Sequence, residues 1–143
     1  MTRHESRELA FILLFEKLFT ESSVEEILLH AGEARNVEAD SFAVSLATGA
    51  VDNMEIIDEI ISRHSIKWSQ KQMSRVALSV MRLAVYEMMY LADIPVSVSI
   101  NEAVELAKVY GGDEDASFIN GVLGGIARNE NTVEDASVNE ASV

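Results

Sequence analysis

The single proline of this chain, Pro95, places the strongest constraint on how the chain can fold. A proline ring fixes φ, removes a backbone donor and disfavours the helical conformation at the preceding residue, Ile94. A helix that comes before Pro95 must therefore end by about Asp93. A new element begins after it, and residues 93–123 contain the clearest signals for where helices begin and end.

Two of these signals are a capping box and a double glycine. Ser99 and Glu102 have the S-x-x-E spacing in which each side chain accepts a hydrogen bond from the other residue's amide. The spacing predicts a helix that begins at Ser99 and buries one stripe, formed by Ile100, Ala103, Val104 and Ala107. We expect Gly111 to end this helix in the left-handed C-cap position and Asp115 to cap the next helix.

The helix after Asp115 has a second apolar stripe, made of Ile119, Val122, Leu123 and Ile126. Phe118 lies at the edge of that stripe and Asn120 lies off it. Both side chains are therefore available for contacts outside the core.

The same stretch matches a known pattern. Residues 93–111 read D-I-P-x-x-V-x-I-N-E-A-V-E-L-A-K-x-Y-G, and residues 118–123 read F-I-N-G-V-L. Upstream, L-A-V-Y-E at 83–87, Trp68, and the early arginines Arg3 and Arg7 support the match. Over residues 2–128 the chain resembles the NusB family of bacterial transcription antitermination factors.

Helical periodicity extends through the N-terminal part of the chain. Residues 4–20 carry apolar side chains on two opposite faces, which predicts a central helix buried on both sides. The alternative is that one rim of this helix, Phe15 and Phe19, docks a partner. Ser22 or Ser23 can cap the short helix that follows.

The middle of the chain predicts two longer helices. Residues 39–64 have one apolar stripe, with Gly49 inside it as a close-packing point. A polar connector over residues 65–71, which contains Trp68, leads to residues 72–91. That segment is apolar nearly all round, which is typical of a buried central helix.

Arg82 and Glu87 interrupt this apolar segment, and buried charges need partners. Arg82 is either a structural ion pair or a guanidinium that reaches a surface groove and meets phosphate. No segment has the alternation and turn residues of a strand. We expect an all-α fold of about seven helices, and the resemblance implies two small helical subdomains that share long central helices.

Charge and composition limit the functional classes. The chain has 143 residues and a formal net charge of −13, whereas nucleic-acid-binding proteins usually gather Lys and Arg into a patch. We expect one domain over residues 1–129 and a disordered acidic tail over residues 130–143. The absence of cysteine and of a long uncharged apolar span predicts a cytoplasmic protein.

No pattern of catalytic or metal-binding residues is present in the sequence. His4, His30 and His64 are scattered, which predicts three surface histidines, and residues 113–115 lack the spacing of a calcium loop. The glycines at 121, 124 and 125 follow no strand and precede no Lys-Ser/Thr. We therefore expect neither an enzyme nor a cofactor or metal.

The resemblance implies binding instead. NusB family members bind boxA, a short single-stranded RNA element of leader and ribosomal RNA transcripts, as a heterodimer with the ribosomal protein NusE, within the RNA polymerase complex that contains other Nus factors. The family's RNA contacts map onto Arg3, His4, Arg7, Phe118 and Asn120, and we add Arg82 from its charge. For the protein partner we select Phe15 and Phe19, from the rim of the first helix, and Ala77, which aligns with the family position for partner choice. Like some relatives, the chain could also form a homodimer.

Several positions depart from the family pattern. Glu5 lies in a normally arginine-rich turn that here also contains His4, Ser117 replaces the lysine before Phe118, and Ala77 lies where partner choice depends on an acidic residue. We expect the isolated chain to bind RNA more weakly and with more salt sensitivity than its relatives, with basic NusE supplying much of the charge.

Two alternatives remain open at this stage. One is a protein-interaction module in which RNA binding has faded. The other is the NusB-like domain of an RNA methyltransferase, which the absence of a βαβ cofactor region disfavours.

Overall fold

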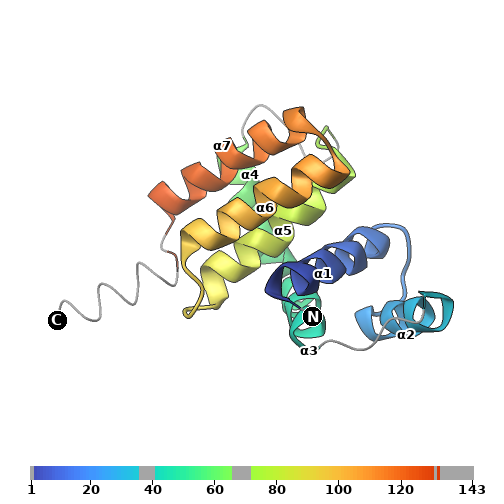
Figure 1. Cartoon of the computed structure of the whole chain (residues 1–143). Coiled ribbons are helices and arrows are strands. Elements are labelled where there is room, and N and C mark those ends of the chain that lie inside the picture. The colour runs from blue at the N-terminus through green and yellow to red at the C-terminus, as the bar shows by residue number, and fades with distance from the viewer. Residues whose placement is uncertain (1, 36–40, 66–71, 131, 133–143) are drawn as a thin grey trace.

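Seven helices account for almost all of the chain that the structure, a computed structural model, describes: residues 2–35, 41–65, 72–130 and 132. They are α1 (Arg3–Lys17), α2 (Val24–Arg35), α3 (Ser41–Asp52), α4 (Met54–His64), α5 (Arg75–Tyr90), α6 (Val96–Tyr110) and α7 (Asp113–Asn129) (Figure 1). No strand occurs in these residues, so the all-α prediction is confirmed. No helix among them is long and apolar enough to cross a membrane.

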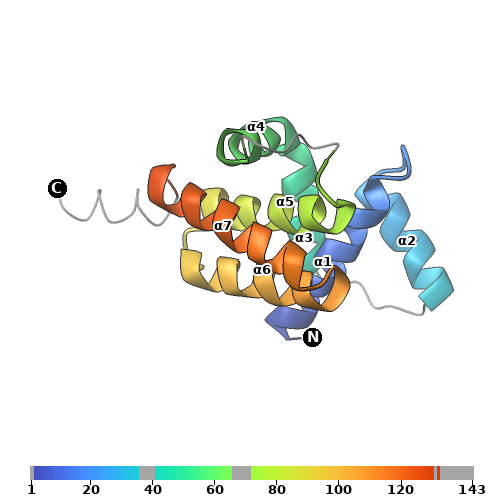
Figure 2. The ribbon, with the colours of Figure 1, turned by 90° about the horizontal axis from the view of Figure 1, so that it is seen from above.

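The helices form two groups, which contact each other mainly where α5 packs against α1 and α3. Helices α1, α2 and α3 pack together, and α4, α6 and α7 surround α5 (Figures 1 and 2). Helix α1 also packs against α5, and α5 contacts α3 in return. This arrangement agrees with the two helical subdomains expected from the resemblance.

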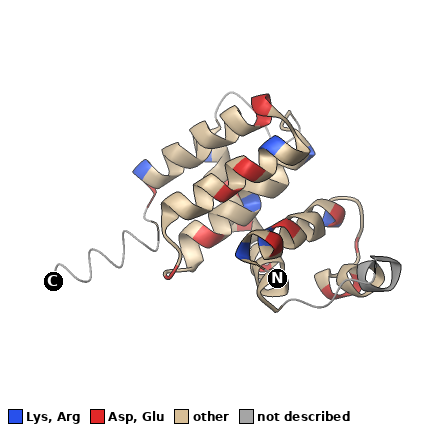
Figure 3. Cartoon of the chain, in the orientation of Figure 1, with Lys and Arg blue, Asp and Glu red and all other residues tan. Residues whose placement is uncertain are grey.

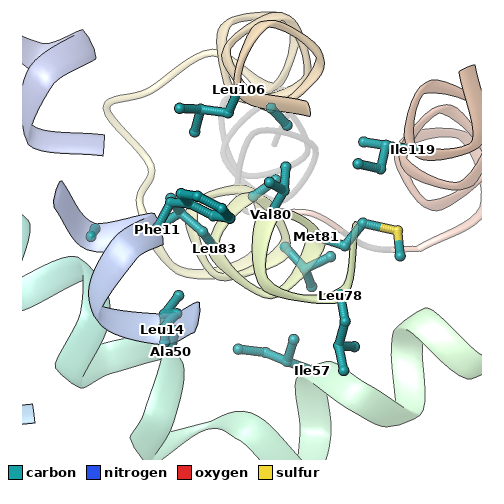
Figure 4. Packing of buried hydrophobic residues seen from close by; sticks show 14 of the residues in the cluster. Phe11, Leu14, Ala50, Ile57, Leu78, Val80, Met81, Leu83, Leu106 and Ile119 are labelled. Atoms are coloured by element: carbon teal, nitrogen blue, oxygen red, sulfur yellow. The ribbon is translucent and has the colours of Figure 1, made fainter. Parts of the chain in front are cut away.

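The core is centred on α5, which packs against α1, α3, α4, α6 and α7. Figure 4 shows Leu78, Val80, Met81 and Leu83 of α5 at this centre. Residues of the surrounding helices point toward them: Phe11 and Leu14 of α1, Ala50 of α3, Ile57 of α4, Leu106 of α6 and Ile119 of α7. Helix α1 buries both Leu9 and Leu13 on one face and Phe11 and Leu14 on the other. The predictions that α1 and α5 are central helices are therefore confirmed.

The prediction of a single helix over residues 39–64 is wrong, because Asn53 interrupts the helix between α3 and α4. This residue has φ −113° and ψ 16°, and its side-chain amide donates to the carbonyl of Gly49 at 2.8 Å. An asparagine side chain that bonds to nearby backbone competes with the helical ladder. The close-packing role of Gly49 is confirmed, since a Cβ there would collide with the ring of Tyr86.

The capping box predicted at Ser99 is also wrong. Helix α6 begins at Val96 with Pro95 as its N-cap, and the Pro95 carbonyl already accepts from the amides of Val98 and Ser99. Ser99 is buried one turn inside the helix. Its hydroxyl donates to Glu87 on α5, and the Glu102 carboxylate pairs with His4 on α1.

The double glycine ends α6 as predicted, but the roles of its residues differ. Gly112 has the positive φ, 104°, whereas Gly111 has φ −121°. Helix α7 begins at Asp113, so Asp115 lies in its first turn instead of capping it. At the other short helix the structure selects Ser23, whose hydroxyl accepts from the amide of Glu26 at 3.1 Å.

The residue that follows α7 packs against the end of α4. Glu130 lies 2.8 Å from the Nε2 atom of His64 and 3.4 Å from Arg63, both at the end of α4. Thr132 is 1% exposed. His64 is therefore a packed residue and not a surface histidine. The tail over 133–143 and the Trp68 connector over 66–71 lie outside the described residues.

Candidate nucleic-acid and partner interface

The first turn of α1 is fixed by a capping box. The Thr2 hydroxyl accepts from the amide of Glu5 at 3.1 Å, and the Glu5 carboxylate accepts from the amide of Thr2 at 3.0 Å. These hydrogen bonds lower the pKa of Glu5. The acidic residue that departs from the family's arginine pattern therefore caps the helix, and it orients Arg3 and His4 on the surface.

Arg3 is held by an aromatic ring on α3. Its guanidinium carbon lies 3.7 Å from the centre of the Phe42 ring. A guanidinium that stacks on a ring uses its face, so the N–H groups at its edge still point away from the ring. This geometry suits Arg3 for a contact with phosphate.

His4 is held on the other side of α1 by α6. Its Nδ1 atom lies 2.7 Å from the Oε2 atom of Glu102, and the two side chains are 49% and 27% exposed. The hydrogen bond to Glu102 and its negative charge raise the pKa of His4, against an opposing effect of burial. The first turn of α1 therefore presents a histidine that keeps its proton to higher pH than usual.

Arg7, predicted to contact RNA, lies one turn deeper and is 5% exposed. Its Nε atom donates to both carboxylate oxygens of Glu87 on α5, at 3.1 and 3.0 Å. Ser99 of α6 donates to the same carboxylate at 3.0 Å. The structure thus places Arg7 in a buried network that joins three helices, where its charge is already compensated.

Arg82 also has a protein partner. Its Nε and Nη2 atoms donate to the two carboxylate oxygens of Asp58 on α4, at 2.9 and 2.8 Å. This bidentate pair is the structural ion pair that the sequence left as one of two options. The side chain is largely buried, although it lines one wall of a surface cavity together with Lys17 and Phe19.

Phe118 and Asn120 lie on α7, away from the first turn of α1. The Phe118 ring is half-buried and lines a cavity of about 330 Å³ with Gln72, Met73, Ser74, Glu114 and Asp115. The Ser74 hydroxyl donates to Asp115 at 2.8 Å and so joins α7 to the start of α5. Asn120 is exposed. Phe118 and Asn120 therefore lie apart from Arg3 and His4, although all four are predicted to contact RNA.

Aromatic residues of α1 and of the turn after it form a row that reaches the surface. Phe15 lies 6.0 Å from Phe11 and 5.4 Å from Phe19 between ring centres, and Phe19 is 57% exposed. Arg75, at the start of α5, lies 4.8 Å above the Phe19 ring. Ala77, in contrast, is 0% exposed, so a partner cannot touch its side chain in this conformation.

The structure adds Phe42, Glu102 and Arg75 to the predicted surface residues. Each acts through a contact between helices that are far apart in the sequence, and periodicity reports only neighbours on one helix. Figure 3 shows Lys and Arg distributed over several helices that also carry Asp and Glu.

Comparisons with known proteins give a consistent family. The model of the NusB family matches residues 4–128. The transcription antitermination protein NusB of Bacillus licheniformis is 42% identical over 126 residues, which are 88% of this chain and 96% of that protein. The fold matches T. maritima NusB with a TM-score of 0.78 at 34% identity, over 90% of this chain and 92% of that one. It also matches, at TM-score 0.78 and 27% identity, a chain from a crystal structure of the antitermination factors NusB and NusE in complex with dsRNA, over 90% of this chain and 98% of that one.

Proposed function

This chain belongs to the NusB family, and we propose that it acts in transcription antitermination by binding boxA-type single-stranded RNA of ribosomal RNA transcripts as a heterodimer with NusE. The family is not a family of enzymes, so the described residues are assigned to binding. The place of action is the cytoplasmic RNA polymerase complex, together with other Nus factors.

The observation that carries the proposal is the fold match to a chain from a crystal structure of NusB and NusE in complex with dsRNA, which supports an RNA ligand and a NusE partner. The single-stranded boxA element is what the family resemblance implies. The surface of this chain supports it in two places. Arg3 and His4 are exposed on a capped helix turn, and the Phe118 ring lines an open cavity on α7.

The two places suit different parts of an RNA strand. Arg3 and protonated His4 can hold phosphates, while a base can stack on Phe118 and hydrogen-bond to Asn120. Arg7 and Arg82 act indirectly, since their guanidiniums hold Glu87 and Asp58 inside the domain. The exposed cations of the site are therefore few.

NusE completes the site in this proposal. The Phe15–Phe19 row with Arg75 offers an aromatic surface for that partner. A basic partner beside a chain of net charge −13 would supply the phosphate contacts that this chain lacks. A homodimer through the same surface is the competing assembly, and sizing the chain with and without NusE distinguishes them.

The first test is binding of a boxA-like oligonucleotide, measured by electrophoretic mobility with and without NusE. We expect Phe118→Ala to weaken binding by about fivefold to a hundredfold, since stacking of one base contributes ~1–3 kcal/mol. Arg3→Ala should weaken binding of all single strands alike, because phosphate contacts do not read sequence. An RNA duplex of the same sequence serves as the comparison ligand.

Matched controls isolate these effects. Ile56→Ala removes an exposed apolar side chain from α4, and Arg63→Ala removes one exposed cation from the same helix. Both controls should bind like the wild type. If the wild type does not bind the oligonucleotide, and Phe118→Ala and Arg3→Ala leave readthrough unchanged while NusE is still captured, the chain is instead a protein-interaction module without RNA recognition.

A further inference from the structure

The pair between His4 and Glu102 brings an acidic side chain onto the surface assigned to RNA. Glu102 belongs to α6, and its Oε2 atom lies 2.7 Å from the Nδ1 atom of His4 across the contact between α6 and α1. Both side chains remain partly exposed, so a phosphate can reach the Nε2 edge of the imidazole while this carboxylate lies at the Nδ1 edge of the same ring. The carboxylate occupies the Nδ1 edge of the ring, and a phosphate oxygen would be held at the Nε2 edge.

We propose that Glu102 is a positioning residue of the RNA surface, one that holds the His4 imidazole on α6 and repels a phosphate held at the other edge of that imidazole, so that the chain binds RNA less tightly than the same surface without this carboxylate. The inference rests on the proposed function. Its physical basis is that a phosphate at the Nε2 edge of the imidazolium remains close enough to the carboxylate at the Nδ1 edge for the two negative charges to repel each other.

The charged groups around His4 are few and come from three helices. On α1, Glu8 raises the pKa of His4 and Arg7 lowers it, while Arg3 and Glu5 flank it in the sequence. On α6, Glu102 has the largest effect and raises the pKa. On α5, Glu87 faces this region, but its carboxylate is bound by Arg7.

These charges make RNA binding depend on pH in a defined direction. Bound phosphate favours imidazolium, so the affinity falls as pH rises through the pKa of His4 in the RNA-free protein. Glu102 raises that pKa, and its removal shifts the fall to lower pH. At a pH below the pKa of His4 in both the wild type and Glu102→Gln, His4 is protonated in both proteins, and they differ only in the negative charge of Glu102. The gain in RNA affinity from removing Glu102 is therefore largest at low pH and shrinks as pH rises.

The test compares Glu102→Gln with Glu105→Gln in the full chain. Glu105 lies on the same helix, is exposed and pairs only with Lys108 among the contacts described, at 3.7 Å, so both variants lose one negative charge. With a boxA-like oligonucleotide and NusE, we expect Glu102→Gln to bind about threefold to tenfold more tightly at pH 6, an effect of one nearby charge. Glu105→Gln should stay within twofold of the wild type. In the absence of RNA, NMR titration should give a lower pKa for His4 in Glu102→Gln alone.

The outcomes separate this inference from the proposed function. Equal RNA affinities of the two variants, or an unchanged pKa of His4 in Glu102→Gln, overturn the inference while wild-type binding and its loss in Phe118→Ala leave the proposed function standing. If neither the wild type nor any variant binds the oligonucleotide with NusE present, the proposed function fails, and the inference fails with it.

Discussion

Two arginines that the sequence suggested for RNA lie in internal ion pairs. Arg7 joins Glu87 and Arg82 joins Asp58, and the first pair is buried on both sides. A buried guanidinium is tolerated only when a carboxylate compensates it and further hydrogen bonds satisfy the pair. Ser99 supplies one such bond to Glu87, so three helices depend on one carboxylate.

Glu87→Gln should therefore destabilise the chain strongly. The change leaves the Arg7 guanidinium buried without a countercharge, and breaking a buried pair in this way costs about 3–5 kcal/mol. Glu105→Gln breaks an exposed pair with Lys108 and should cost less than about 1 kcal/mol. Urea unfolding followed by circular dichroism measures both. A Glu87→Gln cost no larger than that of Glu105→Gln would show that water or another group compensates Arg7.

At the scale of helices, patterns local in sequence were reliable and patterns that depend on distant partners were not. The stripe of Ile119, Val122, Leu123 and Ile126 is buried, because helical spacing alone places these side chains on one face. Ser99 and Glu102 have the spacing of a capping box, yet they bond to Glu87 and His4. No local signal distinguishes a capping serine from one that meets a carboxylate on another helix.

The candidate site is predicted from sequence only where local spacing decides the position of a side chain. Phe118 was located at the edge of its stripe from spacing, and it is half-buried as that position requires. The burial of Arg7 depends on which helix packs over it, and the sequence around Arg7 does not contain that information. The break at Asn53 was missed because neither proline nor glycine marks it.

Two glycines inside helices should respond to alanine with opposite signs. At Gly49 a methyl group would collide with Tyr86, which is stacked on Tyr90, so overpacking of about 1–3 kcal/mol should exceed the gain in helix propensity. At Gly121 a Cβ meets nothing within 4 Å, so Gly121→Ala should stabilise by about 0.5–1 kcal/mol. Thermal unfolding of the two variants beside the wild type measures the difference. Stabilisation by Gly49→Ala would mean that the Tyr86 ring moves aside at little cost.

For the whole molecule, net charge decides how RNA can be held. The formal charge is −13, and the first turn of α1 offers Arg3 and His4 at its surface while Arg7 is internal. Since the salt dependence of binding counts phosphate contacts, an isolated chain with about two of them should respond weakly to salt. The burial of Arg7 thus reverses the sequence-based expectation of unusual salt sensitivity and retains the expectation of weak binding.

The salt dependence of binding, measured by filter binding from 50 to 200 mM salt at pH 6, should therefore differ between the lone chain and its complex with NusE. For single strands the slope of log affinity against log salt is about −0.7 per phosphate neutralised, so two contacts predict about a sevenfold loss over this range. The complex should show a steeper slope and higher affinity, because the partner adds cations. Arg3→Ala should reduce the slope of the lone chain by about 0.7, and Arg63→Ala, on α4, should leave it unchanged. Equal slopes with and without NusE, or nanomolar binding by the lone chain at physiological salt, would mean that cations elsewhere on this chain hold the RNA.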